Sequence, residues 1–213
     1  MFFKIRIINK KFKTMATFIT SKAVGETITI DVNASNGYWK YNHDGVDSSI
    51  FNQKAGFQTI TVANANGEFT IIPCSSNGTV SGNVISLDLE NNQLTSFDGT
   101  GLTALYDLTL NSNNLASLDI SGLNVLRYLR VMNNPSINNP STNNSFLAKL
   151  AANEAANGES IWLGEFYTTG GRTAAGTTDY DYLIVNGWTV DGADLVVVGS
   201  SKLRIKGVSQ INP

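Results

Sequence analysis

A repeat of 21 residues in the middle of the chain constrains the fold more than any other feature of the sequence. The segments 84–104, 105–125 and 126–146 carry similar residues at the same offsets. The agreeing columns are Val84/Leu105/Leu126, Leu87/Leu108/Leu129, Leu89/Leu110/Val131, Asn92/Asn113/Asn134, Leu94/Leu115, Phe97/Leu118, Asp98/Asp119 and Leu102/Leu123. One unit of this length cannot bury its apolar side alone, so the period predicts units that stack against one another.

Within each repeat the spacing of the leucines predicts a short β-strand. Leu87 and Leu89 are two residues apart, so they point to one side of a strand while Asp88 points to the other. An asparagine follows each strand, at the point where the chain must bend. We expect these amides to bond the backbone groups of adjacent units as a buried ladder, formed by Asn92, Asn113 and Asn134.

The second repeat matches the pattern L-x-x-L-x-L-x-x-N-x-L through Leu105, Leu108, Leu110, Asn113 and Leu115. On these residues the segment 84–140 resembles the leucine-rich repeat family. Its L-T-S-F-D and L-A-S-L-D segments are similar to the repeats of Bacteroidetes proteins and their bacteriophages. The resemblance implies a short solenoid with an N-terminal β leader domain.

The third repeat departs from the pattern, which predicts that the stack ends there. Ser136 and Asn139 stand where apolar residues are expected, and Pro135 and Pro140 intrude. So short a stack needs caps on both sides. We therefore expect a mainly β fold with few short helices, in which a leucine-rich-repeat solenoid (84–144) is capped by a β-sandwich-like domain (15–83) and a C-terminal α/β cap (145–213).

The N-terminal flank has the alternation of β-strands. Ile28, Ile30 and Val32 alternate with polar residues, and Asp44-Gly45 and Asn66-Gly67 are turn signals. The segment S-K-A-V-G-E-T-I-T-I is similar to the leader domain that precedes such repeats in bacterial and phage proteins.

The C-terminal flank predicts two helices, a strand and a hairpin, and A-G-T-T-D-Y-D-Y-L-I-V-N-G-W-T-V is similar to the closing segment of the same proteins. The expected elements are a helix from Ser145 to Asn157, a strand around Ile161, Leu163 and Phe166 that extends the repeat sheet, a helix capped by Thr177 or Thr178 and ended by Gly187, and a hairpin of residues 195–198 with 203–205.

Basic residues are concentrated at the N-terminus. The first thirteen positions hold five of the fifteen basic residues, and the other 200 hold ten basic and seventeen acidic side chains, a net charge of −7. Such an acidic body is not expected to bind nucleic acid. Residues 1–14 are either an over-called stretch before a true start at Met15, or a strand or docking arm in which apolar Phe3 and Ile5 alternate with basic Lys4 and Arg6.

The sequence predicts neither a signal peptide nor a transmembrane helix. Lys10, Lys11, Lys13 and Lys22 interrupt the apolar region that a signal peptide requires. No apolar run approaches the ~20 residues that span a bilayer. Cys74 is the single cysteine, so an intrachain disulfide is excluded.

No catalytic, cofactor or metal site is expected. His43 is interpreted as a turn residue and Cys74 as a packed thiol. Asn42, Asp44 and Asp47 lack the spacing of a calcium loop. The glycine-rich segment 171–178 lacks the lysine of a phosphate loop. Only proximity suggests Glu159 and Glu165 as a pair of catalytic acids.

Stacking of the repeats would align their outward strand residues into the rows Ser86–Asp107–Tyr128, Asp88–Thr109–Arg130 and Glu90–Asn111–Met132. Tyr, Arg and Met are favoured in interfaces. The predicted binding face comprises Asp88, Asp107, Thr109, Tyr128, Arg130 and Met132. The alternative is an ordinary solvated face on which Arg130 balances charge. Trp39, with Tyr38 and Tyr41, is either a second, sugar-stacking patch or part of the core.

The sequence therefore predicts a non-enzymatic binding protein, and three hypotheses stay open. The first is a recognition or adhesion module on the virion surface or tail fibre of a phage that infects Bacteroidetes, which binds a protein or glycan on a host or particle surface. The missing signal peptide favours it, because virion proteins are assembled inside the cell. The second is a structural virion protein that binds only other virion subunits, which oligomerisation through the arm would favour. The third is a bacterial surface or secreted protein whose export signal was lost or misannotated.

Overall fold

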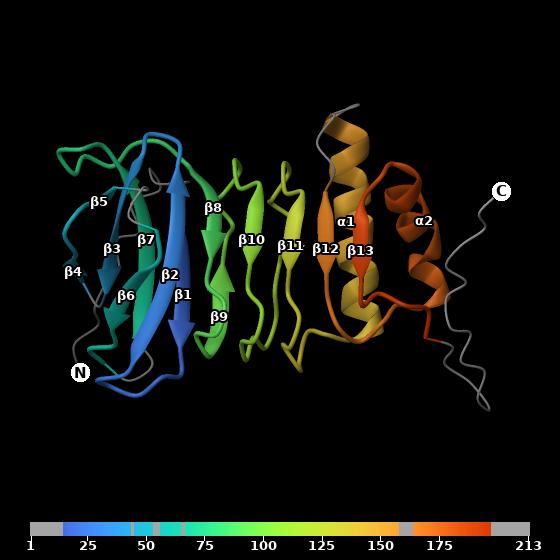
Figure 1. Ribbon diagram of the computed structural model, residues 1–213, viewed down its shortest axis with the longest axis horizontal. Helices are drawn as coiled ribbons and strands as arrows, with labels where there is room; N and C mark the ends of the chain where they lie inside the picture. Colours follow the sequence, from blue (N-terminus) through green and yellow to red (C-terminus); the bar gives the residue numbers. More distant parts are fainter. Residues whose placement is uncertain (1–14, 44, 53–55, 65–66, 158–163, 197–213) are drawn as a thin grey trace, which may run out of the picture.

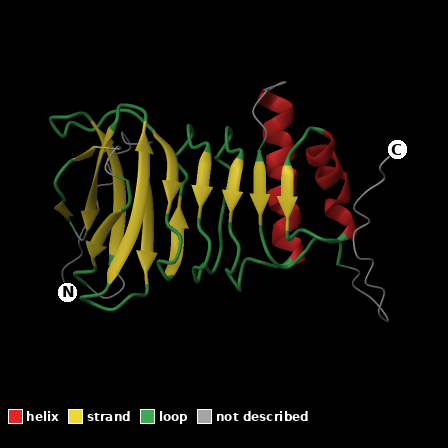
Figure 2. Ribbon diagram, in the orientation of Figure 1, coloured by secondary structure: helices red, strands yellow, loops and turns green. Residues whose placement is uncertain are grey.

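The computed structural model describes residues 15–43, 45–52, 56–64, 67–157 and 164–196. Two β-sheets form most of this part, and the helices gather at its C-terminal end (Figures 1 and 2). The expected mainly β fold with few short helices is confirmed. The N-terminal arm, the predicted strand residues Ile161 and Leu163, and most of the predicted final hairpin lie outside the described residues.

One sheet contains seven strands and runs the length of the molecule (Figure 1). In spatial order the strands are β13 (Thr189–Asp191), β12 (Glu165–Tyr167), β11 (Tyr128–Arg130), β10 (Asp107–Thr109), β8 (Val84–Asp88), β2 (Thr27–Ala34) and β6 (Gln58–Thr61). The five strands from β8 to β13 are parallel, and β2 and β6 continue the sheet in antiparallel fashion. Strand β12 therefore extends the sheet of the repeats, as the sequence predicts.

The second sheet covers the N-terminal part of the first. Its strands are β1 (Ala16–Thr20), β3 (Tyr38–His43), β4 (Val46–Asp47), β5 (Phe51–Asn52), β7 (Glu68–Cys74) and β9 (Leu94–Asp98), and all their pairings are antiparallel. Alternate residues of both sheets are buried in one core, which includes Phe18, Phe69, Ile28 and Ile30. The rings of Phe18 and Phe69 stack with centroids 5.3 Å apart.

Strands β8, β10 and β11 pair residues that stand 21 positions apart in the sequence. Leu108 of β10 lies between Leu87 of β8 and Leu129 of β11, and all three are at most 1% exposed. Because the register preserves the repeat, side chains at equivalent offsets share one side of the sheet. The buried columns therefore form the core under the sheet, and the intervening residues point to the other side.

The asparagine column ties successive segments together. The Oδ1 atom of Asn113 accepts hydrogen bonds from the N–H groups of Asn92 (3.1 Å) and Leu94 (2.9 Å). Its Nδ2 donates to the carbonyls of Leu89 (3.0 Å) and Leu110 (2.9 Å). The side chain is 2% exposed, so it replaces water for backbone groups of two segments at once.

The neighbouring asparagines extend this column in both directions. The Oδ1 atom of Asn134 accepts from the N–H of Leu115 (3.3 Å), and its Nδ2 donates to the carbonyl of Leu110 (2.8 Å). Asn92 instead contacts Thr29 of β2, accepting from its N–H (2.8 Å) and donating to its carbonyl (2.6 Å). The N-terminal flank is thus joined to the first repeat by the same side chain that joins the repeats to each other.

A left-handed residue stands directly before each asparagine of the column. Asn91, Ser112 and Asn133 have φ angles of 59°, 55° and 57°, again 21 positions apart. Residues other than glycine adopt this conformation at a cost, and asparagine tolerates it best. The bend that it makes explains how the chain leaves each strand and turns the next amide inward.

Helix α1 (Pro140–Asn157) begins five residues before the predicted start, so the prediction of Ser145 as its N-cap was wrong. Pro140 opens the helix, and the Oδ1 atom of Asn139 accepts from the N–H of Thr142 (3.1 Å). Proline suits the first helical position, where its missing N–H is not needed, and asparagine is a favoured cap. The predicted buried stripe of Phe146, Leu147, Leu150 and Ala151 packs into the core.

Helix α2 (Thr177–Val185) follows directly from the 3-10 turn η2 (Ala174–Gly176). The predicted capping by Thr177 or Thr178 was wrong: Gly176 occupies the N-cap position, and no side-chain cap bond forms there. Continuation from the 3-10 turn makes a capping side chain unnecessary. Gly187 ends the helix as predicted, with a φ of 82° and its N–H bonded to the carbonyl of Ile184.

A buried ion pair fixes α1 to the sheet. Arg127, directly before β11, lies 3.3 Å from the carboxylate of Glu154, and both side chains are at most 9% exposed. The indole N–H of Trp188 donates to the same Glu154 oxygen (3.2 Å). Figure 1 shows α1 behind β12 and β13, so the face of the sheet that is turned to the viewer is not covered by this helix.

Substitution Asn113→Ala should destabilise the fold by about 3 kcal/mol or more, because it leaves buried N–H and C=O groups without partners. Chemical denaturation of the variant and the wild type measures this change. The matched control is Asn114→Ala, since Asn114 is exposed and its backbone bond to Leu94 does not need the side chain. We expect the control to stay within about 0.5 kcal/mol of wild type. Equal effects of the two substitutions would contradict the role of the column.

Candidate functional site

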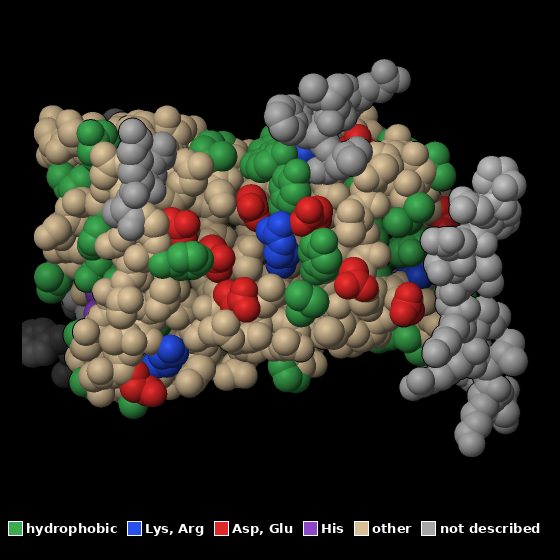
Figure 3. All heavy atoms as spheres, in the orientation of Figure 1, with side chains coloured by type: hydrophobic (Ala, Val, Ile, Leu, Met, Phe, Trp, Pro, Cys, Tyr) green, Lys and Arg blue, Asp and Glu red, His purple; other side chains and the backbone are tan. Residues whose placement is uncertain are grey.

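The candidate site is the open face of the seven-stranded sheet, which faces the viewer in Figure 3. The pairing register aligns its residues into two rows. They are Asn33–Ser86–Asp107–Tyr128–Glu165–Thr189 and Asp31–Asp88–Thr109–Arg130–Tyr167–Asp191. These positions alternate along each strand with the buried Leu87, Leu108, Leu129 and Phe166, so short strands of only three residues are enough to define the face.

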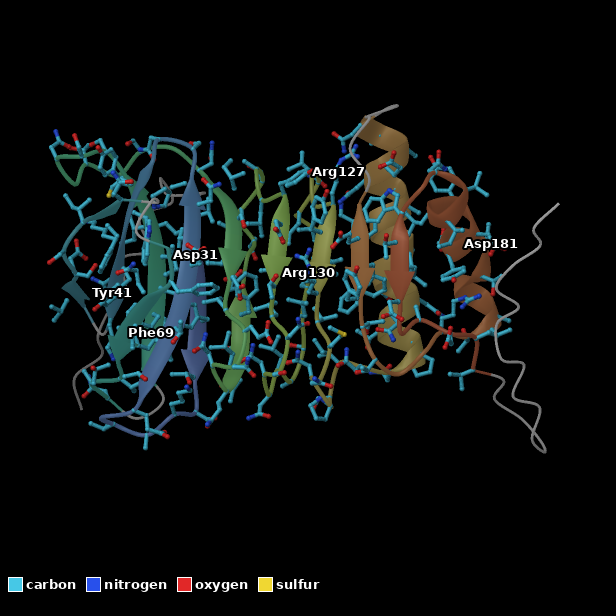
Figure 4. The ribbon with its side chains drawn as sticks, in the orientation of Figure 1. Asp31, Tyr41, Phe69, Arg127, Arg130 and Asp181 are labelled. Atoms are coloured by element: carbon cyan, nitrogen blue, oxygen red, sulfur yellow. The ribbon has the colours of Figure 1, made fainter. Side chains whose placement is uncertain are left out.

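Arg130 is at the centre of this face (Figure 4). One guanidinium nitrogen lies 3.0 Å from the carboxylate of Asp107, and the other lies 2.6 Å from that of Glu165. The guanidinium carbon is 5.7 Å from the ring centroid of Tyr128 and 5.8 Å from that of Tyr167. We call these five residues the arginine cluster. The guanidinium of Arg130 is held by two carboxylates and two aromatic rings, so this side chain is rigid and already partly desolvated.

Tyr106 extends the aromatic part of the cluster. Its ring centroid lies 5.1 Å from that of Tyr128, with the planes tilted by 56°. Burial, followed by its hydrogen bond with Tyr128, raises the pKa of Tyr106 to about 12. The phenol of Tyr106 therefore ionises less readily than that of an ordinary tyrosine.

The part of the face nearer to the N-terminal flank carries unbalanced negative charge. Asp31 and Asp88 are directly opposite each other across β2 and β8, and Glu90 follows two residues after Asp88. We call these three residues the acidic strip. Burial is the main reason why the pKa of Asp88 is raised, and the charges of Glu90 and Asp31 raise it further, against the lowering effect of the Glu90 N–H and of Arg130.

A shallow hollow adjoins the acidic strip. It is lined by Thr29, Phe57, Asp88, Glu90 and Asn91. Phe57 is 60% exposed, which is unusual for a ring of this size. Carboxylates and an exposed aromatic ring therefore lie side by side there, and Figure 3 shows the acidic side chains along this part of the face.

The structure brings most of the predicted face together. Asp88, Asp107, Tyr128, Arg130 and Met132 lie on this side of the sheet and are partly exposed. Thr109 is 7% exposed and contacts Arg130 (Oγ1 to guanidinium, 3.4 Å), so it supports the cluster from below.

Sequence reasoning missed the residues that lie outside the repeats. Glu165 and Tyr167 come from β12, and Asp31 comes from β2. The 21-residue spacing does not reach either strand, because helix α1 separates β11 from β12 and β2 runs antiparallel. The alternation Glu165-Phe166-Tyr167 was the available signal, and it places the same two residues outward.

The interpretation of His43 was wrong, and the alternative left open for Trp39 is decided. His43 is not a turn residue: it ends β3, is 7% exposed and stacks on Phe69 at 3.9 Å. Its Nε2 accepts from the N–H of Ala63 (3.0 Å), which explains why an imidazole is accommodated there. Trp39 is 1% exposed and stacks on Phe51, so it belongs to the core and not to a sugar-stacking patch. Cys74 is buried, as a packed thiol would be.

The remaining candidates take part in local structure. Asp47 pairs with Lys40 (2.5 Å) and accepts from Asn42 (2.7 Å). Arg172 of the glycine-rich segment donates to the carbonyl of Ala193 (2.5 Å) and stacks on Tyr180 at 3.8 Å. Glu159 lies outside the described residues. In the part of the chain that the structure describes, no three His, Cys, Asp or Glu side chains form a group that could hold a metal ion.

No helix in the described ranges is both long and apolar enough to cross a membrane. Comparison of the chain with protein-family models, with curated proteins and with solved structures finds no match.

The raised pKa of Asp88 makes a prediction about pH. A carboxyl group whose pKa is higher in the folded state stabilises the fold below its ordinary pKa, and this stabilisation is lost as the pH rises through the raised value. Asp88→Asn should therefore be more stable than wild type at pH 7, by about 0.2–1 kcal/mol for one opposed charge pair. The difference should shrink as the pH falls toward 4. Denaturation at both pH values measures it.

Asp119→Asn is the control, for which the expected change in stability at pH 7 has the opposite sign. Hydrogen bonds from the backbone and side chain of Ser121 lower the pKa of Asp119, so its ionised form stabilises the fold above the ordinary pKa. This variant should be less stable than wild type at pH 7, and the loss should vanish in acid. A loss of stability in Asp88→Asn at pH 7 would contradict the account of the acidic strip.

Proposed function

We propose that this protein is a non-enzymatic binding protein that uses the open face of its seven-stranded sheet to recognise a protein or glycan on a host-cell or particle surface. The proposal takes the parallel strands with their asparagine column as a short leucine-rich-repeat solenoid, which the flanks cap. The observation that carries it is the arginine cluster, which presents tyrosine rings and a prearranged cation on an open surface.

The chemistry of the cluster suits recognition. Tyrosine and arginine dominate the energetic centres of interfaces, because they combine a large apolar surface with hydrogen-bonding groups. Arg130 is already fixed by Asp107 and Glu165. Binding of a ligand would therefore cost little additional conformational entropy of this side chain. The same arrangement occupies both carboxylates, which is why we favour binding over acid–base chemistry.

We further propose that the protein is part of a virion, as a surface or tail-fibre component of a bacteriophage. The sequence resemblance of the repeats supports this proposal, and fold-level resemblance is an argument by analogy. A structural role among virion subunits and a bacterial cell-surface role are the competing assignments.

Variants of the tyrosines test the proposed face. Tyr128→Ala and Tyr167→Ala should each weaken binding of labelled protein to host cells or to an arrayed glycan by about tenfold or more, as expected for residues at an interface centre. Tyr182→Ala is the matched control, because Tyr182 is exposed on α2 and not on the sheet. Unchanged binding in both face variants, with wild-type circular dichroism, would contradict the proposal.

Mass spectrometry of fractions from the source culture tests the location. We expect the intact protein in purified virions and not in the cell envelope. Recovery from the envelope or the medium, with absence from the particles, would replace the phage assignment with a bacterial surface protein.

A further inference from the structure

The described part of the chain leaves the acidic strip without a cation of its own. Six Lys and Arg side chains lie in the described ranges. Five of them have partners elsewhere: Lys22 at Thr27, Lys40 at Asp47, Lys149 at Asn124, Arg127 at Glu154 and Arg172 at Ala193. The sixth, Arg130, is held by Asp107 and Glu165.

This arrangement is unfavourable for the protein alone. Like charges directly opposite each other in a sheet destabilise the pair, and Asp31 faces Asp88 in that way. Glu90 adds a third carboxylate beside the exposed Phe57. A cation from outside would relieve the repulsion, and an apolar neighbour of that cation could cover the ring.

Two terminal segments outside the described residues combine basic and apolar residues and hold no acidic ones. Residues 197–213 carry three basic side chains, and residues 1–14 carry more. Residues 1–14 hold five basic and no acidic side chains. Lys4 and Arg6 alternate with Phe3, Ile5 and Ile7, so an extended strand of this sequence would present cations on one side and apolar residues on the other.

We infer that the acidic strip and its hollow bind the basic N-terminal segment, residues 1–14, of a second copy of this protein. Residue 16 opens β1, which belongs to the opposite sheet, whereas the strip is on the outward face of the seven-stranded sheet. To reach the strip of its own molecule, the N-terminal segment would have to pass around the edge of the sheet. The strip of a neighbouring molecule can be reached without this detour. The contact is head-to-tail, so each molecule offers one segment and one strip.

The test measures self-association of the full chain by sedimentation velocity at low and high salt. We expect concentration-dependent association at low salt that weakens as salt screens the charges. It should be lost in a chain that starts at Met15. The triple variant D31N/D88N/E90Q should associate at least about tenfold more weakly, since each ion pair contributes modestly and three are removed.

The matched control is D179N/D181N/D194N, which removes three acidic charges from the C-terminal end (Asp181 is labelled in Figure 4). It should associate as wild type does. A labelled peptide of residues 1–14 should bind the Met15 chain but not its D31N/D88N/E90Q form. It should bind more tightly than a peptide of residues 200–213, which has three basic residues instead of five.

Three results would overturn the inference. The first is undiminished association of D31N/D88N/E90Q, and the second is association that survives removal of residues 1–14. The third is a full-length chain that stays monomeric although the peptide binds the strip, which would place the segment on its own molecule. The variants leave Tyr128, Tyr167 and Arg130 in place, so host-surface binding through the arginine cluster can fail or succeed independently.

Discussion

The rest of the structure depends on the hydrogen bonds of three buried asparagine amides. A strand of three residues pairs few backbone groups, and the chain bends sharply after each one. The bend leaves N–H and C=O groups inside the protein, where an unpaired group costs about 1–3 kcal/mol. Asn113 bonds five such groups in two successive segments, and Asn92 bonds the N–H and C=O groups of Thr29 in β2. The column therefore sets the register of the sheet and joins it to the N-terminal flank.

This register determines what the open face presents. Because residues 21 positions apart are neighbours in β8, β10 and β11, the central three positions of each row share one offset in the repeat. The row positions bring Arg130 next to Asp107 and Glu165, so one half of the face is aromatic and its carboxylates are paired with a cation. The half that borders β2 brings Asp31 against Asp88 and stays acidic. One sheet thus offers two surfaces of different chemistry, and we assign them to different partners.

The sequence predicted those parts of the structure that a local pattern specifies. Alternation identified β2, and the repeat identified β8, β10 and β11 with the two outward rows that pass through Asp107 and Arg130. It could not predict that β2 pairs with β8 or that β12 brings Glu165 to Arg130, since these contacts join segments far apart with no shared period. The start of α1 was missed because the cap lies on Asn139, which the repeat pattern had counted as a lost apolar position. His43 was misplaced because a neighbouring Asp-Gly turn signal outweighed the strand that leads to it.

Amide hydrogen exchange by NMR is the most direct test of the asparagine column. The N–H groups of Thr29, Asn92, Leu94 and Leu115 donate to asparagine Oδ1 atoms and not to a β-ladder partner. Our account predicts that these four amides exchange only when the whole protein unfolds, with protection equal to that of the core strands. Rapid exchange at these positions, while Leu87 and Leu108 remain protected, would show that the column is not what holds the segments together.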